Sequence, residues 1–242
     1  MVMTRSTVPV TRSSPFARLA PIYDAVYASG RKPYREEAAR IVATVRDRLG
    51  PGRLTLLDVA CGTGEHLRFL ADHFDVAGLD RSPEMLAIAR AKLPSIKLHE
   101  ADMTDFALPR PFDVVTCLFA SVGYLASEAE LSRAVARMGG HLAPGGLLVL
   151  EPAVTPDRLQ PPRRTVVEIV DDDRRIRRTT SARHEPSELV ITFRFEIEGP
   201  DDATAFEEIH RIRLFEMTTY LDAVRSAGLE IVAERPWLLA VP

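Results

Sequence analysis

The chain has 242 residues, a formal net charge of −3 and a hydrophobic share of 46%. This length is near the upper limit for one hydrophobic core, so a single domain with an insertion is favoured over two separate domains. Because basic and acidic residues are interspersed, we expect no nucleic-acid partner. No apolar run is long enough to span a membrane, and residues 1–14 lack the apolar core of a signal peptide. We therefore expect a cytoplasmic protein with no membrane partner.

The first 14 residues are rich in threonine, serine and arginine and show no apolar periodicity, so we expect a flexible N-terminus. Helices are predicted at 15–28 and 31–49, and apolar side chains recur at helical spacing in the second stretch. Strand-like and helical segments then alternate as far as residue 151. The predicted strands are 55–60, 76–79, 96–99, 112–118 and 146–151, and the predicted helices are 65–73, 83–93 and 128–141. Such alternation indicates a parallel sheet with helices on both faces.

A different pattern begins after Glu151, where four prolines form a connector that cannot lie inside a sheet. Segments 165–170, 174–182, 189–198 and 206–215 are separated by turn-forming residues and predict an antiparallel meander. Apolar residues alternate from Leu189 to Ile197, so we expect one covered face and one wet face. A helix at 218–227, ending at Gly228, and a strand at 229–233 are predicted to return to the main sheet.

These patterns predict an α/β protein with a Rossmann-like sheet and an antiparallel β insert. We assign residues 1–14 to the flexible N-terminus and residues 15–152 together with 216–242 to the main domain. Residues 153–215 are assigned to the insert, with substrate binding or dimerisation as its role. The cysteines Cys61 and Cys117 lie at predicted strand ends and are expected to be reduced.

Residues 56–64, Leu-Leu-Asp-Val-Ala-Cys-Gly-Thr-Gly, form an apolar strand that runs directly into a glycine-bearing turn. Glycines there let the backbone approach a ligand at the carboxyl edge of the sheet, where open α/β sheets bind ligands. Sixteen residues beyond Gly64, Asp80 ends the second predicted strand, within reach of the two hydroxyls of a ribose. The turn and Asp80 together predict a nucleoside-containing ligand.

The third glycine of a dinucleotide-binding fingerprint is absent, because Leu67 occupies its position. A pyrophosphate is therefore not required at this turn. Asp58 before the turn, Asp80 after the second strand and Asp102-Met103 after the third strand form an ordered set of strand-end residues around one crevice. Asp58 is expected to anchor the loop rather than to bind the ligand.

These features resemble the class I S-adenosylmethionine (AdoMet)-dependent methyltransferases over residues 20–229. Within that superfamily the chain is similar to the N,N-dimethyltransferases that act on nucleotide-linked amino sugars in macrolide antibiotic pathways. The position of the antiparallel insert, between the fifth strand and the last helix, is also similar. The resemblance is carried by Ile22-Tyr23-Asp24, Lys32-Pro33-Tyr34, residues 57–64, residues 85–90 (Met-Leu-Ala-Ile-Ala-Arg), Asp102-Met103, residues 115–119 (Val-Thr-Cys-Leu-Phe) and His210-Arg211-Ile212.

The resemblance implies AdoMet as methyl donor and S-adenosylhomocysteine as product. It implies that Asp80 holds the ribose hydroxyls, that Asp102 accepts from the adenine amino group, and that two tyrosines close over the cofactor. The full set of cofactor-binding residues predicted in this way is Tyr23, Tyr34, Ala60, Gly62, Asp80, Arg81, Asp102, Met103 and Leu118. His66, His73 and His99 are scattered without ligand spacing, so no metal site is predicted.

Methyl transfer to an amine is an in-line displacement, and holding the nucleophile in line can supply up to about 7–11 kcal/mol of the barrier. The amine must also lose its proton, so a modest acceptor helps. Tyr124, Glu151 and His210 are the candidates for catalysis and for contact with the acceptor. His210 shares an alternating strand with Ile212, so a core position is the competing interpretation.

The basic run at 174–178 is most often a solvated strand face. The alternative is that Arg177 and Arg178 bind a diphosphate of the substrate, for which the arginine fork is suited. The chain also departs from the amino-sugar enzymes, which have a histidine where Tyr124 stands and aromatic residues in place of Ala153-Val154. From these two differences we expect an altered acceptor-facing wall. The sequence also ends soon after Trp237, without the longer glycine-containing tail of those enzymes.

The leading hypothesis is an N-methyltransferase that adds one or two methyl groups to a small natural-product precursor, with a nucleotide-linked amino sugar as the expected acceptor. An O-methyltransferase, using a base such as His210, is the alternative within the same class. A non-catalytic AdoMet-binding assembly subunit is the alternative from another class, although intact Asp80, Asp102 and Gly62 argue against it. The exposed face of the antiparallel insert predicts a homodimer.

Overall fold

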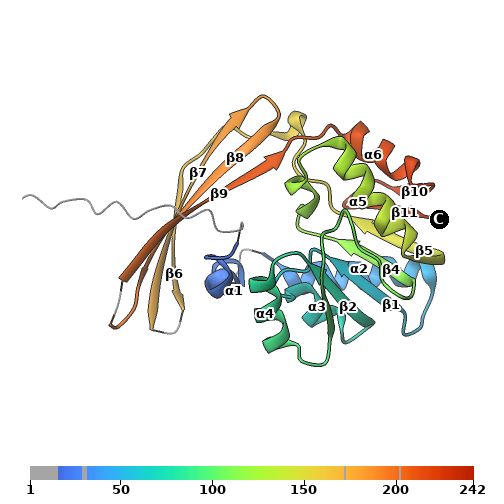
Figure 1. Cartoon of the computed structure of the whole chain (residues 1–242), viewed down its shortest axis with the longest axis horizontal. Coiled ribbons are helices and arrows are strands. Elements are labelled where there is room, and N and C mark those ends of the chain that lie inside the picture. Colours follow the sequence, from blue (N-terminus) through green and yellow to red (C-terminus); the bar gives the residue numbers. More distant parts are fainter. Residues whose placement is uncertain (1–15, 29–31, 172, 202) are drawn as a thin grey trace, which may run out of the picture.

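The computed structural model describes residues 16–28, 32–171, 173–201 and 203–242, so the predicted flexible segment 1–14 lies outside the described residues. The main sheet has seven strands in the order β10-β11-β5-β4-β1-β2-β3 (Figure 1). Five of them are parallel: β1 (Thr55–Val59), β2 (Asp75–Asp80), β3 (Lys97–Glu100), β4 (Phe112–Cys117) and β5 (Leu142–Leu150). The strand order reverses between β1 and β4, where open α/β sheets place their ligand crevice.

Helices cover both faces of this sheet, as predicted. The helices of the main layer are α2 (Tyr34–Leu49), α3 (Glu65–Leu70), α4 (Pro83–Lys92), α5 (Glu128–Gly140) and α6 (Met217–Ser226). Successive side chains of β1 point to opposite faces. Leu56 accordingly packs in a core cluster with residues of α2, whereas Leu57 packs in a second cluster with residues of α5 and α6.

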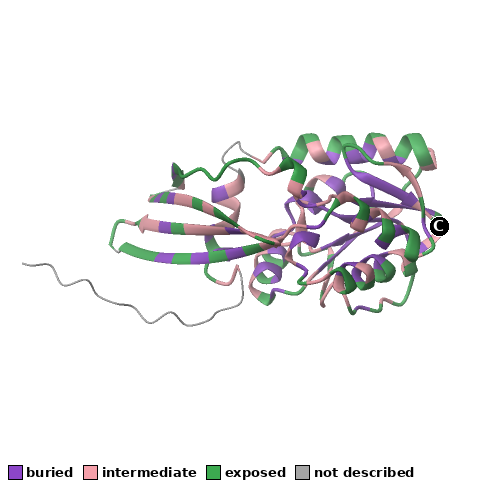
Figure 2. Ribbon diagram, turned by 90° about the horizontal axis from the view of Figure 1, so that it is seen from above, coloured by how far each residue is buried: buried purple, intermediate pink, exposed green. Residues whose placement is uncertain are grey.

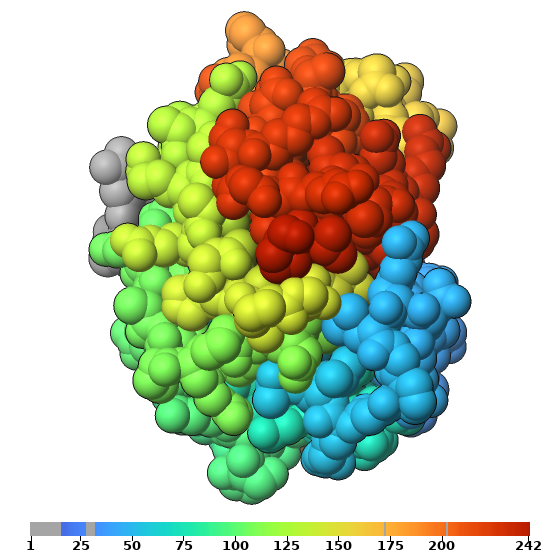
Figure 3. Space-filling view, turned by 90° about the vertical axis from the view of Figure 1, so that its right-hand side faces the viewer, coloured from blue at the N-terminus to red at the C-terminus, as the bar shows by residue number. Residues whose placement is uncertain are grey.

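The C-terminal end of the chain adds a strand that the sequence analysis did not predict. The predicted strand at the end of the chain is β10 (Glu230–Ala233), but β11 (Leu238–Val241) lies between it and β5. β11 is antiparallel to both neighbours, and Leu239 lies opposite Val149 of β5. Figure 3 shows this C-terminal segment in red, beside the yellow segment that contains β5 and the blue segment that contains α2. Burial of Trp237 and Leu239 in the cluster shared with α2 explains why the short strand forms.

A second, antiparallel sheet projects from the main layer (Figure 1). It consists of β6 (Thr165–Asp171), β7 (Arg174–Glu185), β8 (Glu188–Glu198) and β9 (Ala203–Arg213), paired in chain order. The meander is confirmed, and its strands lie inside the predicted insert 153–215, whose boundaries remain predictions. The last strand begins and ends earlier than the predicted 206–215, and Phe215 instead packs in the main core against Tyr220.

Helix α1 (Ala20–Ala28) covers the inner face of this second sheet. The helix is shorter than the predicted 15–28, because residues 16–19 form a turn. Its apolar side chains pack with those of the sheet in one cluster formed by Leu19, Ile22, Val26, Val167, Ile169, Ile176, Phe195 and Phe206. Figure 2 shows the resulting alternation of buried and exposed positions along these strands.

The prediction of one covered and one wet face is wrong at the start of β8. Val190 is fully buried although it points away from the face that carries Ile191 and Phe195, so the outer face is also covered there. Among the described residues, no helix is both long and apolar enough to cross a membrane. A short 3₁₀ helix, η1 (Ser121–Tyr124), follows β4 and contacts β9.

Candidate active site

The turn between β1 and α3 opens the candidate site. Ala60, Gly62 and Gly64 have φ angles of 59°, 55° and 79°, in the left-handed region that favours glycine. A Cβ added at Gly62 would meet no atom within 4 Å, so the backbone of the turn faces open space. The turn therefore leaves room for the close approach to a ligand that the glycine motif predicts.

Two cavities meet at this turn and share Tyr23, Ala60, Gly62 and Ser121 in their walls. The larger has a volume of about 400 Å³ and the smaller about 50 Å³. Every one of the nine predicted cofactor residues lines one or both of them. Asp80, Arg81, Asp102 and Met103 line the larger cavity, and Tyr34 and Leu118 line the smaller one. The structure therefore brings the whole predicted set together, and their role in binding remains a prediction.

Asp80 is held at the end of β2 by two backbone groups. Its Oδ2 accepts from the Gly62 N–H and its Oδ1 accepts from the Ser82 N–H, each at 2.8 Å. Burial raises the pKa of Asp80, and these backbone hydrogen bonds oppose that rise. Each carboxylate oxygen can accept a further hydrogen bond, so both remain able to receive a hydroxyl from the cavity.

Asp102 follows β3 and closes a tight turn. Its Oδ1 accepts from the backbone N–H and the hydroxyl of Thr104 at 2.8 and 2.7 Å, and its Oδ2 lies 3.8 Å from Nη1 of Arg81. Burial works against ionisation of Asp102, but the hydrogen bonds from Thr104 and the charge of Arg81 lower its pKa. Asp102 therefore presents an ionised acceptor at the rim of the larger cavity.

Asp58 lies below the turn, where it is only 2% exposed and accepts from the hydroxyl of Thr116 at 2.7 Å. Burial raises the pKa of Asp58 to about 6. Asp58 also lines the smaller cavity, although its position is consistent with the predicted anchoring role.

The raised pKa of Asp58 gives a prediction for stability. An exposed aspartate loses its proton near pH 4, whereas folded Asp58 holds it to about pH 6, so ionising it costs stability as pH rises through this window. Relative to the unsubstituted chain, Asp58→Asn should therefore gain about 1 kcal/mol in free energy of unfolding between pH 5 and pH 8. Urea titrations at both pH values, without cofactor, measure this gain. An equal difference at the two pH values would contradict it.

Helix α1 is fixed over the turn by polar contacts that the sequence analysis missed. The hydroxyl of Thr63 donates to Asp24 at 2.6 Å. Lys92 Nζ, at the end of α4, lies 2.7 Å from Asp24 and 2.5 Å from Glu65. These contacts hold Tyr23, the neighbour of Asp24 on α1, in the wall of both cavities.

Of the predicted catalytic residues, Tyr124 lines the larger cavity, whereas Glu151 and His210 do not. The Tyr124 hydroxyl lies 2.7 Å from Nδ1 of His210, which is only 1% exposed and lies behind it on β9. Glu151 instead accepts from the backbone N–H of Phe119 at 2.7 Å, where Phe119 has a φ of 56°. The observed contact of Glu151 therefore stabilises a strained loop beside the cavity.

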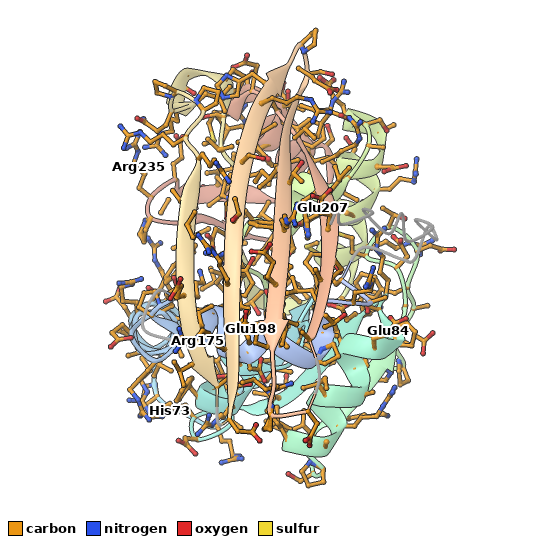
Figure 4. All side chains as sticks on the ribbon, turned by 90° about the vertical axis from the view of Figure 1, so that its left-hand side faces the viewer. His73, Glu84, Arg175, Glu198, Glu207 and Arg235 are labelled. Carbon is orange, nitrogen blue, oxygen red and sulfur yellow. The ribbon has the colours of Figure 1, made fainter. Side chains whose placement is uncertain are left out.

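The two predicted phosphate-binding arginines point to opposite faces of β7, because successive side chains alternate along a strand. Arg177 lies on the outer face, opposite Glu168 and 4.0 Å from Glu196. Figure 4 shows this outer face, with Arg175, Glu198 and Glu207 labelled. Arg178 lies on the inner face and is 9% exposed, with its guanidinium 5.7 Å from the Tyr27 ring centroid. Of the two arginines, only Arg178 therefore faces α1.

Further wall residues came only from the structure. Phe16, Leu79, Ser82, Met85, Ala101, Ser121 and Leu125 complete the lining of the larger cavity. The position of Ser82 could have been predicted from the sequence, because serine before proline signals the start of a helix. Ser82 is indeed the N-cap of α4. Among the described residues, no group of three or more side chains is arranged to hold a metal ion.

The chain is similar to known methyltransferases. Residues 56–146 match the methyltransferase domain family. The dTDP-3-amino-3,6-dideoxy-alpha-D-glucopyranose N,N-dimethyltransferase of Streptomyces fradiae is 42% identical over 215 residues, which cover 88% of this chain and 84% of that protein.

Two solved structures are also similar. The crystal structure of Streptomyces venezuelae DesVI has a TM-score of 0.87 at 36% identity, covering 93% of this chain and 98% of that one. CalS10, an amino pentose methyltransferase from Micromonospora echinaspora solved with AdoMet bound, has a TM-score of 0.81 at 34% identity, covering 90% and 95%. The chain therefore belongs to the AdoMet-dependent methyltransferases, in the family of the amino-sugar N-methyltransferases.

Proposed function

We propose that the protein transfers methyl groups from AdoMet to the amino group of a nucleotide-linked amino sugar. The observation that carries this proposal is the position of Tyr124, which lines the same cavity as Asp80 and whose hydroxyl contacts His210. Relatives named as dTDP-amino-sugar N,N-dimethyltransferases support the acceptor class. Cytoplasm is the proposed compartment, supported by Cys61 and Cys117, which are both buried free thiols.

The residues that line the two cavities suit the polar groups of AdoMet. Bound AdoMet would supply a methyl group activated by its sulfonium charge. Asp80 would bind the ribose hydroxyls and Asp102 the adenine amino group, while the open space in front of Gly62 accommodates the methionine part. Tyr23 and Tyr34 would exclude water from the α1 side, and Leu118 would flank the sulfonium.

The acceptor would approach from the side of Tyr124. Tyr124 would contact the amino group, with His210 acting through it, and Glu151 would keep the adjoining loop in place through Phe119. Burial raises the pKa of Tyr124, so its hydroxyl stays protonated. Arg178 would meet the phosphates of the substrate, for which Arg177 points the wrong way.

The proposal is tested by mass spectrometry of acceptors incubated with AdoMet and the purified chain. The panel contains nucleotide-linked amino sugars, the free amino sugars and matched hydroxylated analogues. We expect gains of one or two methyl groups on nucleotide-linked amines. Gains on hydroxyls alone would establish O-methylation instead. If no acceptor gains a methyl group but AdoMet still binds, we would conclude that the protein is a non-catalytic AdoMet-binding subunit.

We also propose a homodimer formed through the outer face of the antiparallel sheet. Val166, Val170 and Ile209 are exposed on this face by 46%, 76% and 56%. They lie among arginines and glutamates of opposite charge, a mixture that suits a self-complementary two-fold contact. Light scattering coupled to gel filtration should give twice the chain mass of 26.8 kDa. A monomer across micromolar concentrations would contradict the proposal.

A further inference from the structure

Behind Tyr124, three side chains from two distant segments form one hydrogen-bonded row. The hydroxyl of Tyr124, on η1, lies 2.7 Å from Nδ1 of His210. Nε2 of the same ring lies 3.2 Å from Oε2 of Glu208, two residues earlier on β9. The other carboxylate oxygen of Glu208 accepts from the backbone N–H of Leu19 at 2.9 Å. The row therefore runs from the cavity wall to the start of α1.

The acceptor at one end of the row fixes the protonation pattern along it. An ionised carboxylate can only accept, so Nε2 of His210 must carry the proton shared with Glu208. Nδ1 of the neutral ring is then an acceptor, and the Tyr124 hydroxyl donates to it. That leaves the lone pairs of the Tyr124 oxygen able to accept from a further donor, and Tyr124 is a residue of the cavity wall. This is the arrangement in which an acid orients an imidazole that serves a hydroxyl.

The surroundings of the row are dry. His210 is 1% exposed and Glu208 is 8% exposed. The rings of Phe16 and Phe193 lie 4.9 Å from the imidazole, on edge-to-face geometry. A buried carboxylate is costly unless it is paired, and a neutral acceptor would be enough to satisfy the Leu19 N–H. Oε2 of Glu208 has Nε2 of His210 as its hydrogen-bonding partner, so an imidazolium at this position would lie directly beside the carboxylate.

We propose that Tyr124, His210 and Glu208 form a proton relay for the amine, with Glu208 as the positioning residue. This proposal rests on the proposed function. An N–H proton of the substrate ammonium passes to the Tyr124 oxygen while the Tyr124 O–H proton passes to Nδ1 of His210. The amine keeps the electron pair of its N–H bond and becomes the neutral nucleophile. The result is an imidazolium that the Glu208 carboxylate stabilises, and Tyr124 is unchanged.

The charged and titratable groups around the row come from three parts of the chain. Tyr23 and Tyr27 lie on α1, and Arg178 lies on β7 over the rings of Tyr27 and Phe193. Arg81 follows β2 and its charge acts on Tyr124 from the cavity. Both arginines disfavour an imidazolium, so the carboxylate of Glu208 is what favours it. Neutralising Glu208 removes this stabilisation of the imidazolium.

The first test needs no acceptor. In the full chain, saturated with S-adenosylhomocysteine and labelled with ¹⁵N-histidine, NMR should show His210 as the Nε2–H tautomer. Glu208→Gln should move the titration midpoint of this ring to lower pH. Glu207→Gln is the matched control, because it removes the same charge from the neighbouring outward-facing position (Figure 4), and it should leave the midpoint unchanged. An Nδ1–H tautomer, or an equal midpoint in Glu208→Gln, overturns the relay.

The second test uses an acceptor that the unsubstituted chain methylates. Glu208→Gln and His210→Gln should each lower kcat by at least about 100-fold, the usual contribution of a positioned acid–base group. The double variant should be no slower than the slower single variant, because the two act as a unit. Calorimetry should show the AdoMet Kd within about threefold of the unsubstituted value.

The two tests separate the relay from the proposed function. Three results would overturn the relay and give Glu208 a purely structural role at Leu19. They are an unchanged kcat in Glu208→Gln, losses that multiply in the double variant, and a loss confined to AdoMet affinity. A chain that methylates no amine refutes the proposed function, and the NMR titration then still decides whether Glu208 orients His210.

Discussion

Replacing Asp80 with alanine should weaken AdoMet binding by about 1–3 kcal/mol, or roughly 5- to 150-fold in Kd. The loss has two sources. Ribose hydroxyls are left without an acceptor, and the backbone N–H groups of Gly62 and Ser82 lose the carboxylate that holds the turn open. Isothermal titration calorimetry with AdoMet measures the change directly.

The matched control is Asp75→Ala, at the opposite end of β2. Asp75 has an exposed side chain that pairs only at 3.4 Å with exposed Arg110, and it lies far from the carboxyl edge of the sheet. Its replacement should leave AdoMet affinity unchanged. Equal affinities for the Asp80→Ala variant and the unsubstituted chain would refute the assignment of the cavity to the cofactor.

Replacing Phe195 with alanine should lower the free energy of unfolding by about 3–5 kcal/mol. Phe195 is fully buried at the centre of the second sheet, where its ring stacks on Phe206 at 5.0 Å and packs in one cluster with Leu19 and Ile22. Removing the ring leaves a cavity between the sheet and α1. Because Tyr23 on α1 lines both cavities, the variant should also bind AdoMet more weakly.

Urea unfolding followed by circular dichroism measures the first effect. Phe195→Leu serves as the graded control, because it retains most of the apolar volume and should cost less than about 1.5 kcal/mol. A loss below about 1 kcal/mol in Phe195→Ala would show that α1 does not depend on this sheet for its position. If Phe195→Ala shows the full expected loss in free energy of unfolding but binds AdoMet with unchanged affinity, packing of the second sheet does not influence the cofactor site.

Much of the candidate site was predictable because it is encoded locally. The turn at residues 60–64 and Asp80 lie at the ends of neighbouring parallel strands. Parallel strands end at one edge of a sheet, so their terminal residues converge whatever the rest of the chain does. The same reasoning placed Asp102 correctly in the wall of the cavity.

The acceptor side was less predictable, because its contacts join segments that are remote in sequence. Leu19 and Glu208 are 189 positions apart, and Tyr124 and His210 are 86 apart. No periodicity in either segment signals these pairs. The sequence also did not predict β11, whose four residues form a strand only because β5 and β10 offer free edges on both sides.

The sequence by itself determined the α/β architecture, the antiparallel insert and the cofactor-facing edge, because hydrophobic period and strand-end motifs act over short distances. The tertiary structure alone decided which arginine of β7 faces α1, since the phase of an alternating strand depends on what covers it. It also decided that His210 lies behind Tyr124 with Glu208 as its partner, because only docking of β9 against η1 and α1 brings these groups within hydrogen-bonding distance.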